Sequence, residues 1–292
     1  MNRDKAKKFK VIAGPFWFYY YVMSYLKGLK LKEDFSHINN YIFFIGYPRS
    51  GHSLIGSLLD AHSDIVISNE MNSLYFFKKK YFRHQIFYFI LRNSKRHAAI
   101  GRSNSDYSYV VPNQWQGKYR KLIGIGDKKG GKSSSIFGDE NHMKLLHNIE
   151  KISQAKLKII HVIRNPYDNV STMILRQVKK NGKELTEDLF NKRVHKYLEL
   201  IETNTKLKAH IPNNICDVHL EDFIANPKKE LIRIFQFLEI DVSQEYIKDC
   251  SSIVWDKTNQ SRFDLPYWTT ERIQNFSNSI KPYAFLNRYN YE

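Results

Sequence analysis

The chain has 292 residues, enough for one large domain or two small ones, and its apolar share of 42% allows a sizeable core. Lys and Arg number 46 against 29 Asp and Glu, and this formal charge of +17 indicates an anionic partner: a nucleotide, a polyanion or an anionic membrane surface. The two cysteines, Cys216 and Cys250, lack metal-ligand spacing and make no disulfide framework, which favours a reducing, cytosolic setting.

The first 35 residues are a basic and aromatic extension. Residues 1–10 are basic, and residues 11–26 are apolar and rich in aromatic side chains. A membrane-spanning helix needs about 20 apolar residues, whereas this run is shorter and contains Gly14, Pro15 and Ser24. It also lacks a cleavage site of the signal-peptide type. We expect a helix packed on the domain, and a peripheral membrane contact through residues 1–35 stays open as the alternative.

Short apolar segments alternate with helical patterns along the rest of the chain. The predicted strands are 41–45, 65–68, 122–125, 158–163 and 214–219, and the predicted helices are 53–61, 140–153, 167–179, 185–210 and 228–238. This alternation predicts an α/β fold, a three-layer sandwich around a central parallel sheet of four to five strands, and the loop that follows the first strand makes it of the P-loop type. We expect a single domain over residues 1–292, with ligands beyond the carboxyl ends of the strands.

The segment Gly46–Ser53, which follows the first strand, carries the strongest functional signal. Its sequence predicts a tight loop that leads into a helix, so that backbone N–H groups converge at the positive end of the helix dipole. The glycine spacing is that of a nucleotide P-loop, except that His52 replaces the usual lysine and the cation is Arg49. We predict a phosphate or sulfate site made of Arg49, Ser50, Gly51, His52 and Ser53.

Two more predicted strands end in residues suited to catalysis. Glu70 emerges just beyond the second strand, where a carboxylate can reach the ligand edge and act as a general base. Lys128 lies in a Gly-rich, Lys-rich turn after the third strand, where it can place a point charge on a transferring anion. The alternatives are an ion-paired glutamate and a basic surface turn.

A second anion site is predicted where the fourth strand turns into a helix. Arg164 ends the strand, Thr172 follows eight residues later, and Arg176 lies one helical turn beyond it. Arginine binds phosphate bidentately and a hydroxyl adds a donor; the neighbouring Ser171 is an alternative source of that hydroxyl. Two anion sites at one sheet edge imply a nucleotide with both a 5′ and a 3′ phosphate.

These motifs resemble those of sulfotransferases that use 3′-phosphoadenosine 5′-phosphosulfate. The loop at residues 46–53 resembles the family's 5′-phosphosulfate loop, and residues 164–172 resemble its 3′-phosphate motif. Leu59-Asp60-Ala61-His62 followed by Glu70 is similar to the pattern of tyrosylprotein sulfotransferases and their bacterial relatives. The resemblance covers roughly residues 41–240. Two departures are His52 in place of a threonine and Leu220 in place of a tyrosine that contacts adenine.

The resemblance implies the roles of individual residues. Glu70 corresponds to the catalytic base and Lys128, less directly, to the catalytic lysine. Basic residues of the C-terminal stretch, Lys257 and Arg262, correspond to side chains that close over the nucleotide. The donor would be 3′-phosphoadenosine 5′-phosphosulfate, with no metal required.

Several functional questions stay open from the sequence. The acceptor carries a hydroxyl group, and the sequence does not distinguish between a glycan, a lipid, a small alcohol and a tyrosine. The basic, aromatic run at residues 76–102 predicts either a solvated surface helix or a groove for an anionic or membrane-borne acceptor. Two rival functions are a P-loop kinase or NTPase and a non-catalytic polyanion-binding protein. No nucleic-acid partner is expected, because no known RNA- or DNA-binding motif is present.

Overall fold

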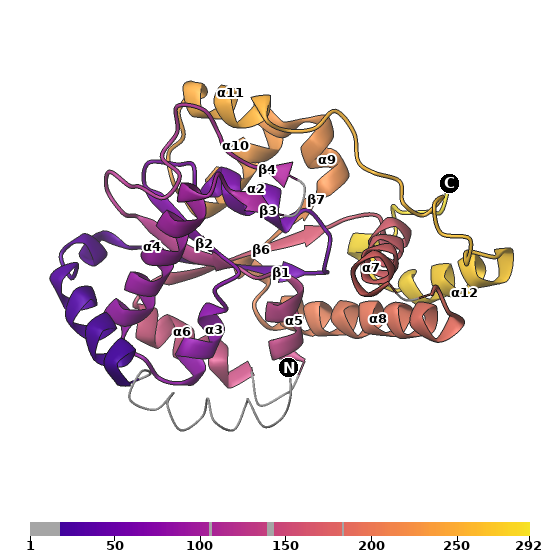
Figure 1. Ribbon diagram of the computed structural model, residues 1–292, viewed down its shortest axis with the longest axis horizontal. Helices are drawn as coiled ribbons and strands as arrows, with labels where there is room; N and C mark the ends of the chain where they lie inside the picture. The colour runs from indigo at the N-terminus through magenta and orange to yellow at the C-terminus, as the bar shows by residue number, and fades with distance from the viewer. Residues whose placement is uncertain (1–17, 105–106, 139–142, 183) are drawn as a thin grey trace.

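The computed structural model describes residues 18–104, 107–138, 143–182 and 184–292 (Figure 1). At its centre is a parallel sheet of five strands in the order β2-β5-β1-β6-β7. These strands are β1 (Asn40–Gly46), β2 (Ile65–Asn69), β5 (Gly124–Lys128), β6 (Lys156–Ile163) and β7 (Ile215–His219). Because β1 is the middle strand, the loop that follows it lies between the loops that follow β5 and β6.

Helices cover both faces of the sheet, as Figure 1 shows. Alternate residues of β1 enter opposite cores: Ile42 and Phe44 enter one, and Tyr41, Phe43 and Ile45 enter the other. The first core packs against α2 (His52–Leu59), α9 (Leu220–Ala225), α10 (Pro227–Leu238) and α11 (Gln244–Ser252). The second packs against α3 (Ser73–Lys78), α4 (Arg83–Ala99), α5 (Gly131–Phe137) and α6 (Met143–Ser153). This arrangement confirms the predicted three-layer sandwich.

A third hydrophobic cluster lies beside β6, at the carboxyl end of the sheet. It joins α7 (Pro166–Asn181), α8 (Glu187–His210) and α12 (Thr270–Ile280) with the C-terminal segment. Tyr47, from the loop after β1, is fully buried in this cluster. The cluster therefore holds the end of the chain against the edge of the sheet where ligands are expected.

The third strand begins and ends later in the chain than the sequence predicts. Leu122 and Ile123 precede β5, and the strand continues through Asp127 to Lys128 instead. Glycines make this register possible, because a Cβ atom on Gly126 would lie 1.9 Å from the carbonyl oxygen of Ile42 on the adjacent strand. Lys128 is therefore the last residue of a strand and not part of the turn that follows it.

Other differences concern short elements. Helices α3, α5, α9, α11 and α12 were not predicted, and neither was the short antiparallel pair of strands β3 (Ser103–Asn104) and β4 (Tyr107–Ser108). The basic run at residues 76–102 contains α4. Residues 18–30 form a helix, whereas residues 1–17 lie outside the described part of the chain. Within the described residues no helix combines the length and hydropathy needed to cross a bilayer.

Candidate active site

A cavity of about 700 Å³ opens at the carboxyl edge of the sheet. It forms where the loops after β1, β2, β5 and β6 meet the segment that follows α11. The predicted site residues that line it are Arg49, Gly51, His52, Ser53, Glu70, Lys128, Arg164, Thr172, Arg176 and Lys257. Three other predicted residues, Ser50, Ser171 and Arg262, are not among the residues that line this cavity.

The loop after β1 has the conformation of an anion cradle. Arg49 and Gly51 both adopt positive φ angles, of 75° and 91°, and Gly51 leads directly into α2. A Cβ atom on Gly51 would lie 2.6 Å from Leu220, so this turn requires glycine. The first-turn N–H groups of a helix have no partner within the helix, and an anion can satisfy them. The loop and the start of α2 therefore present donors to the cavity.

Ser50 links the loop after β1 to α7. Its side chain is fully buried and donates a hydrogen bond of 2.8 Å to Oδ1 of Asn169 on α7. The Asn169 amide in turn donates to the carbonyl oxygen of Pro48. The hydroxyl of Ser50 is thus engaged with the protein. These two hydrogen bonds fasten the loop after β1 to α7.

His52 acts as a buried spacer. Its Nε2 lies 3.0 Å from the carbonyl oxygen of Ile45, and since a carbonyl only accepts, Nε2 carries the proton. Burial lowers the pKa of His52 to about 4, so the ring is neutral at pH 7. A Cβ atom on Gly130 would lie 2.7 Å from the ring, which therefore packs closely between the turns after β1 and β5. Its imidazole does not replace the charge of a P-loop lysine.

Glu70, Lys128 and Ser53 form a contiguous polar cluster in the cavity. Nζ of Lys128 donates to Oε1 of Glu70 at 3.2 Å and to Oγ of Ser53 at 3.1 Å. Burial lowers the pKa of Lys128 despite the neighbouring carboxylate. Partial burial opposes ionisation of Glu70, but the two adjacent lysines outweigh it and lower the pKa of Glu70. At neutral pH the carboxylate is therefore ionised and able to accept a proton.

Asp127 fastens the loop that carries Glu70. Its buried carboxylate accepts hydrogen bonds from the backbone N–H groups of Met71, at 3.0 Å, and Ser73, at 2.8 Å. It also accepts from the hydroxyl of Ser68 at 2.7 Å. Glu70 itself has a left-handed backbone with φ of 55°. The strand pairing of β2 with β5 thus sets the position of the carboxylate.

Arg164 and Thr172 meet as predicted, at the start of α7. Nη1 of Arg164 donates to Oγ1 of Thr172 at 3.1 Å and to the carbonyl oxygen of Arg49 at 3.2 Å. Nη2 donates to the carbonyl oxygen of Asn259, whereas the buried Nε has no hydrogen-bond partner among the residues that the structure describes. Ser171 points the other way, fully buried, and accepts from Nε1 of Trp268 at 2.8 Å. Thr172 is therefore the hydroxyl on the cavity side.

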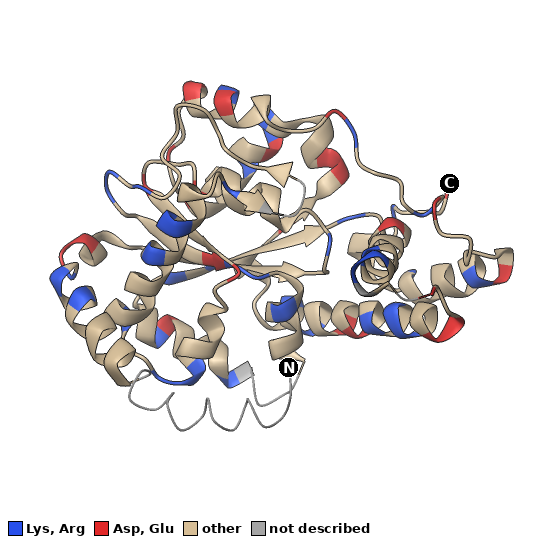
Figure 2. Cartoon of the chain, in the orientation of Figure 1, with Lys and Arg blue, Asp and Glu red and all other residues tan. Residues whose placement is uncertain are grey.

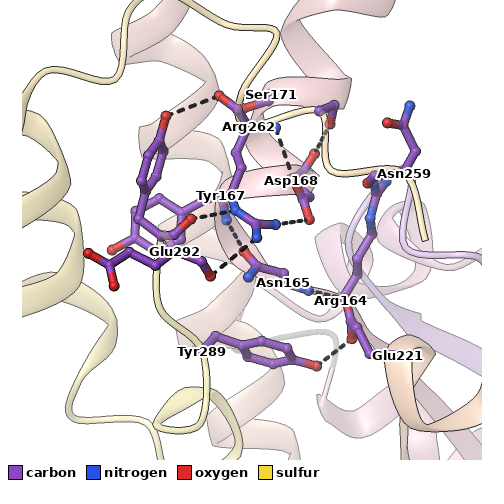
Figure 3. A network of polar contacts seen from close by, with 12 residues as sticks. Arg164, Asn165, Tyr167, Asp168, Ser171, Glu221, Asn259, Arg262, Tyr289 and Glu292 are labelled. Carbon is purple, nitrogen blue, oxygen red and sulfur yellow. Dashed lines mark hydrogen bonds and ion pairs between the residues drawn. The ribbon is translucent and has the colours of Figure 1, made fainter. Parts of the chain in front are cut away.

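Arg262 has a different place from the one expected. Its guanidinium is buried and pairs with Asp168 at 2.7 Å, while its Nε donates to the carbonyl oxygen of Tyr291 (Figure 3). The side chain faces away from the cavity because burial of this charge requires a buried partner. The pair anchors the C-terminal segment on α7. The same segment places Ser261 against Thr172, with 2.6 Å between the two hydroxyl oxygens.

Several lining residues were missed by the sequence reasoning. Lys129 and Lys132 belong to the same Lys-rich turn as Lys128, so their spacing was a usable signal. Trp255 and Tyr107 come from segments without any functional pattern, yet their rings meet in the structure with centroids 5.2 Å apart. Together with Tyr109, Leu220 and Ile224 they give the cavity an apolar wall.

The charged side chains that line the cavity are predominantly positive. Its lining among the described residues includes seven Lys and Arg side chains and one acidic side chain, Glu70. Burial and the nearby Arg176 both lower the pKa of Arg49, which shows how closely the positive charges are placed. In the part of the chain that the structure describes, no group of three or more His, Cys, Asp or Glu side chains is arranged to hold a metal ion. The cavity suits a ligand with several negative charges.

Comparison with known proteins identifies the class of this fold and site. The model of the sulfotransferase family matches residues 41–244, which is more than half of the chain. The chain belongs to the sulfotransferase family. A transferase of the sulfotransferase type is therefore supported by both the match and the fold.

Solved structures show the same fold at low sequence identity. The sulfotransferase domain from the curacin biosynthetic pathway is 16% identical, with a TM-score of 0.51, over 84% of this chain and 99% of that one. Sulfotransferase STF9 from Mycobacterium avium is 12% identical, with a TM-score of 0.52, over 90% of this chain and 81% of that one. A search of curated proteins finds no match.

Proposed function

We propose that this protein transfers the sulfuryl group of 3′-phosphoadenosine 5′-phosphosulfate to a hydroxyl group of an acceptor. The observation that carries the proposal is that the two segments predicted to bind anions line one cavity: the loop after β1, and Arg164 with Thr172. The hydrogen bond of 3.2 Å from Arg164 to the carbonyl of Arg49 ties the two sites directly together. A nucleotide with phosphates on both its 5′ and 3′ positions fits this arrangement.

The donor would lie across the cavity with its charged groups on the basic residues. The 5′-phosphosulfate is bound by the loop at residues 49–53 and the helix terminus, and the 3′-phosphate by Arg164, Thr172 and Arg176. Nε of Arg164, buried without a hydrogen-bond partner among the described residues, is a donor that such a phosphate can satisfy. The adenine packs on the apolar wall, where Trp255 takes the place of the tyrosine that Leu220 replaces.

The chemical step is a displacement at sulfur. The acceptor oxygen forms a bond to sulfur, the bond from sulfur to the bridging phosphate oxygen breaks, and Glu70 takes the acceptor proton. The products are the sulfated acceptor and adenosine 3′,5′-bisphosphate. Lys128 and Arg49 stabilise the charge that develops on the bridging oxygen and the sulfuryl group. Lys128 contacts both Glu70 and Ser53, so it lies between the base and the phosphosulfate loop.

Two features argue against a kinase. Magnesium in P-loop kinases and NTPases is held by a hydroxyl of the loop and a carboxylate at a strand end. Here β6 ends at Ile163 and is followed by Arg164 where those proteins have a carboxylate, and Glu70 is engaged by Lys128 and Lys129. Phosphate charge would therefore be neutralised by the protein's own cations.

Ligand binding followed by turnover tests the proposal. Adenosine 3′,5′-bisphosphate should raise the thermal unfolding temperature far more than adenosine 5′-monophosphate at the same concentration. A labelled donor should then transfer its sulfuryl group to at least one member of a panel of phenols, alcohols and glycans. Magnesium-dependent ATP turnover without donor binding would favour the kinase, and salt-sensitive binding to random nucleic acid alone would favour the polyanion-binding protein.

A further inference from the structure

One face of the helix at residues 18–30 packs closely against α4. The helix lies on the outside of α4, at the left of Figure 1 and away from the arrowheads of the central strands. Ser24 and Gly28 face inward: Nε2 of Gln85 donates to Oγ of Ser24 at 3.1 Å, and a Cβ atom on Gly28 would lie 2.4 Å from the carbonyl oxygen of His84. The helix is thus an integral part of the described fold.

The opposite face of this helix is an exposed apolar stripe. It consists of Phe18, Tyr19, Val22, Leu26 and Leu29, with exposed fractions of 69%, 59%, 36%, 49% and 39%. The spacings of four, four and three residues from Phe18 to Leu29 place these side chains on one side of the helix. Single exposed apolar residues are ordinary, but a continuous stripe over three helical turns indicates a surface that meets an apolar phase.

Basic residues border the stripe. Lys27 and Lys30 are exposed on the helix, which has no Asp or Glu between residues 18 and 30 (Figure 2). The sequence nearer the N-terminus is also basic, because residues 1–10 contain five Lys or Arg and one Asp. An apolar face flanked by cations is the pattern of helices that lie in the interface of an anionic bilayer.

A second cavity, of about 580 Å³, opens beside the end of the same helix. The basic residues that line it are Lys32, Lys80, Arg83, His84 and Lys151, and its described lining includes no Asp or Glu. Tyr25 of the helix packs on the His84 ring with centroids 4.7 Å apart, and Nε2 of His84 is buried with no hydrogen-bond partner in the described part of the chain. Arg83 is held rigidly, because its Nε donates to the carbonyl oxygen of Ser153 at 2.6 Å. The cavity therefore presents a cluster of cationic side chains, which suits a phosphate-bearing headgroup.

We propose that the helix at residues 18–30 binds the surface of an anionic phospholipid membrane. The apolar stripe enters the boundary of the acyl region, while Lys27, Lys30 and the second cavity contact the headgroup phosphates. A second copy of this chain is a poorer occupant, because pairing two stripes would bring the lysines of both copies together. None of the described residues lines both cavities, so the contact leaves the first cavity open.

Co-sedimentation of the full chain with vesicles tests this proposal. The chain should pellet with phosphatidylcholine vesicles that contain phosphatidylserine, and raised salt should weaken that binding. The double variant Lys27→Ser/Lys30→Ser should bind these vesicles about 30-fold more weakly, from roughly 1 kcal/mol per cation at the membrane. The matched control Lys192→Ser/Lys206→Ser removes two exposed lysines from α8 and should bind normally.

The apolar stripe is tested separately. Leu26→Ser/Leu29→Ser should abolish pelleting while leaving the thermal unfolding temperature nearly unchanged, because both side chains are exposed. The proposal is overturned if the full chain does not pellet with anionic vesicles, or if the α8 control loses binding as fully as the Lys27 and Lys30 variant does. It is also overturned if light scattering shows a dimer that the leucine variant dissociates, since a second copy then covers the stripe.

Discussion

Replacing Glu70 by glutamine separates its proposed role as a base from any structural role. The amide keeps an oxygen at the position that accepts the hydrogen bond of 3.2 Å from Lys128, so the buried lysine should stay in place. The side chain is 55% exposed, which makes a large loss of stability unexpected. What the variant loses is the negative charge and the ability to accept a proton.

The expected loss of turnover is about 10² to 10⁴-fold, or roughly 3 to 5 kcal/mol of activation free energy. Affinity for adenosine 3′,5′-bisphosphate should be equal or higher, because the substitution removes the one acidic side chain in the described lining of a cavity with seven cations. Initial rates with a labelled donor and the best acceptor from the screen measure turnover, and calorimetry measures binding.

Glu239 offers a matched control for this experiment. Its carboxylate is also 55% exposed and also pairs with two lysines, Lys156 at 2.5 Å and Lys158 at 2.7 Å, but it lies outside the cavity. Glu239→Gln should retain the rate of the unmodified protein. If Glu70→Gln turns over within a factor of about three of that rate, the assignment of Glu70 as the base is refuted.

Three further predictions follow from the same geometry. Arg164→Ala should weaken binding of adenosine 3′,5′-bisphosphate far more than binding of adenosine 5′-monophosphate, and calorimetric losses of equal size would remove the argument from two anion sites. Because its pKa is lowered, Glu70 should lose its charge, and the rate should fall, only as pH drops below 4.5; an acid limb near neutrality in the pH–rate profile would contradict this. Asp168→Ala should destabilise the fold by about 3–5 kcal/mol in denaturant unfolding, because it leaves the buried Arg262 unpaired, and a loss below about 1 kcal/mol would contradict the account of that pair.

Local chemistry in the chain was enough to predict the architecture and the tight turn that follows β1. Buried strands alternating with helices leave few arrangements besides a parallel sheet covered on both faces, and the sheet of five strands confirms this. The loop at residues 46–53 was readable because glycine conformations and a helix terminus depend on neighbours in sequence. The single-domain organisation and the individual catalytic roles stay predictions.

Tertiary structure alone decided which side chains share the cavity. The contact of Glu70 with Lys128 depends on β2 pairing with β5, and strand order is set by packing between distant segments. Ser171 and Thr172 are adjacent in sequence, but one residue turns about 100° around a helix, which sends Ser171 to the core and Thr172 to the cavity. The sequence resemblance places Arg262 over the nucleotide, whereas the structure pairs it with the buried Asp168. A buried charge is costly without an oppositely charged partner, so this pair holds Arg262 in the C-terminal segment.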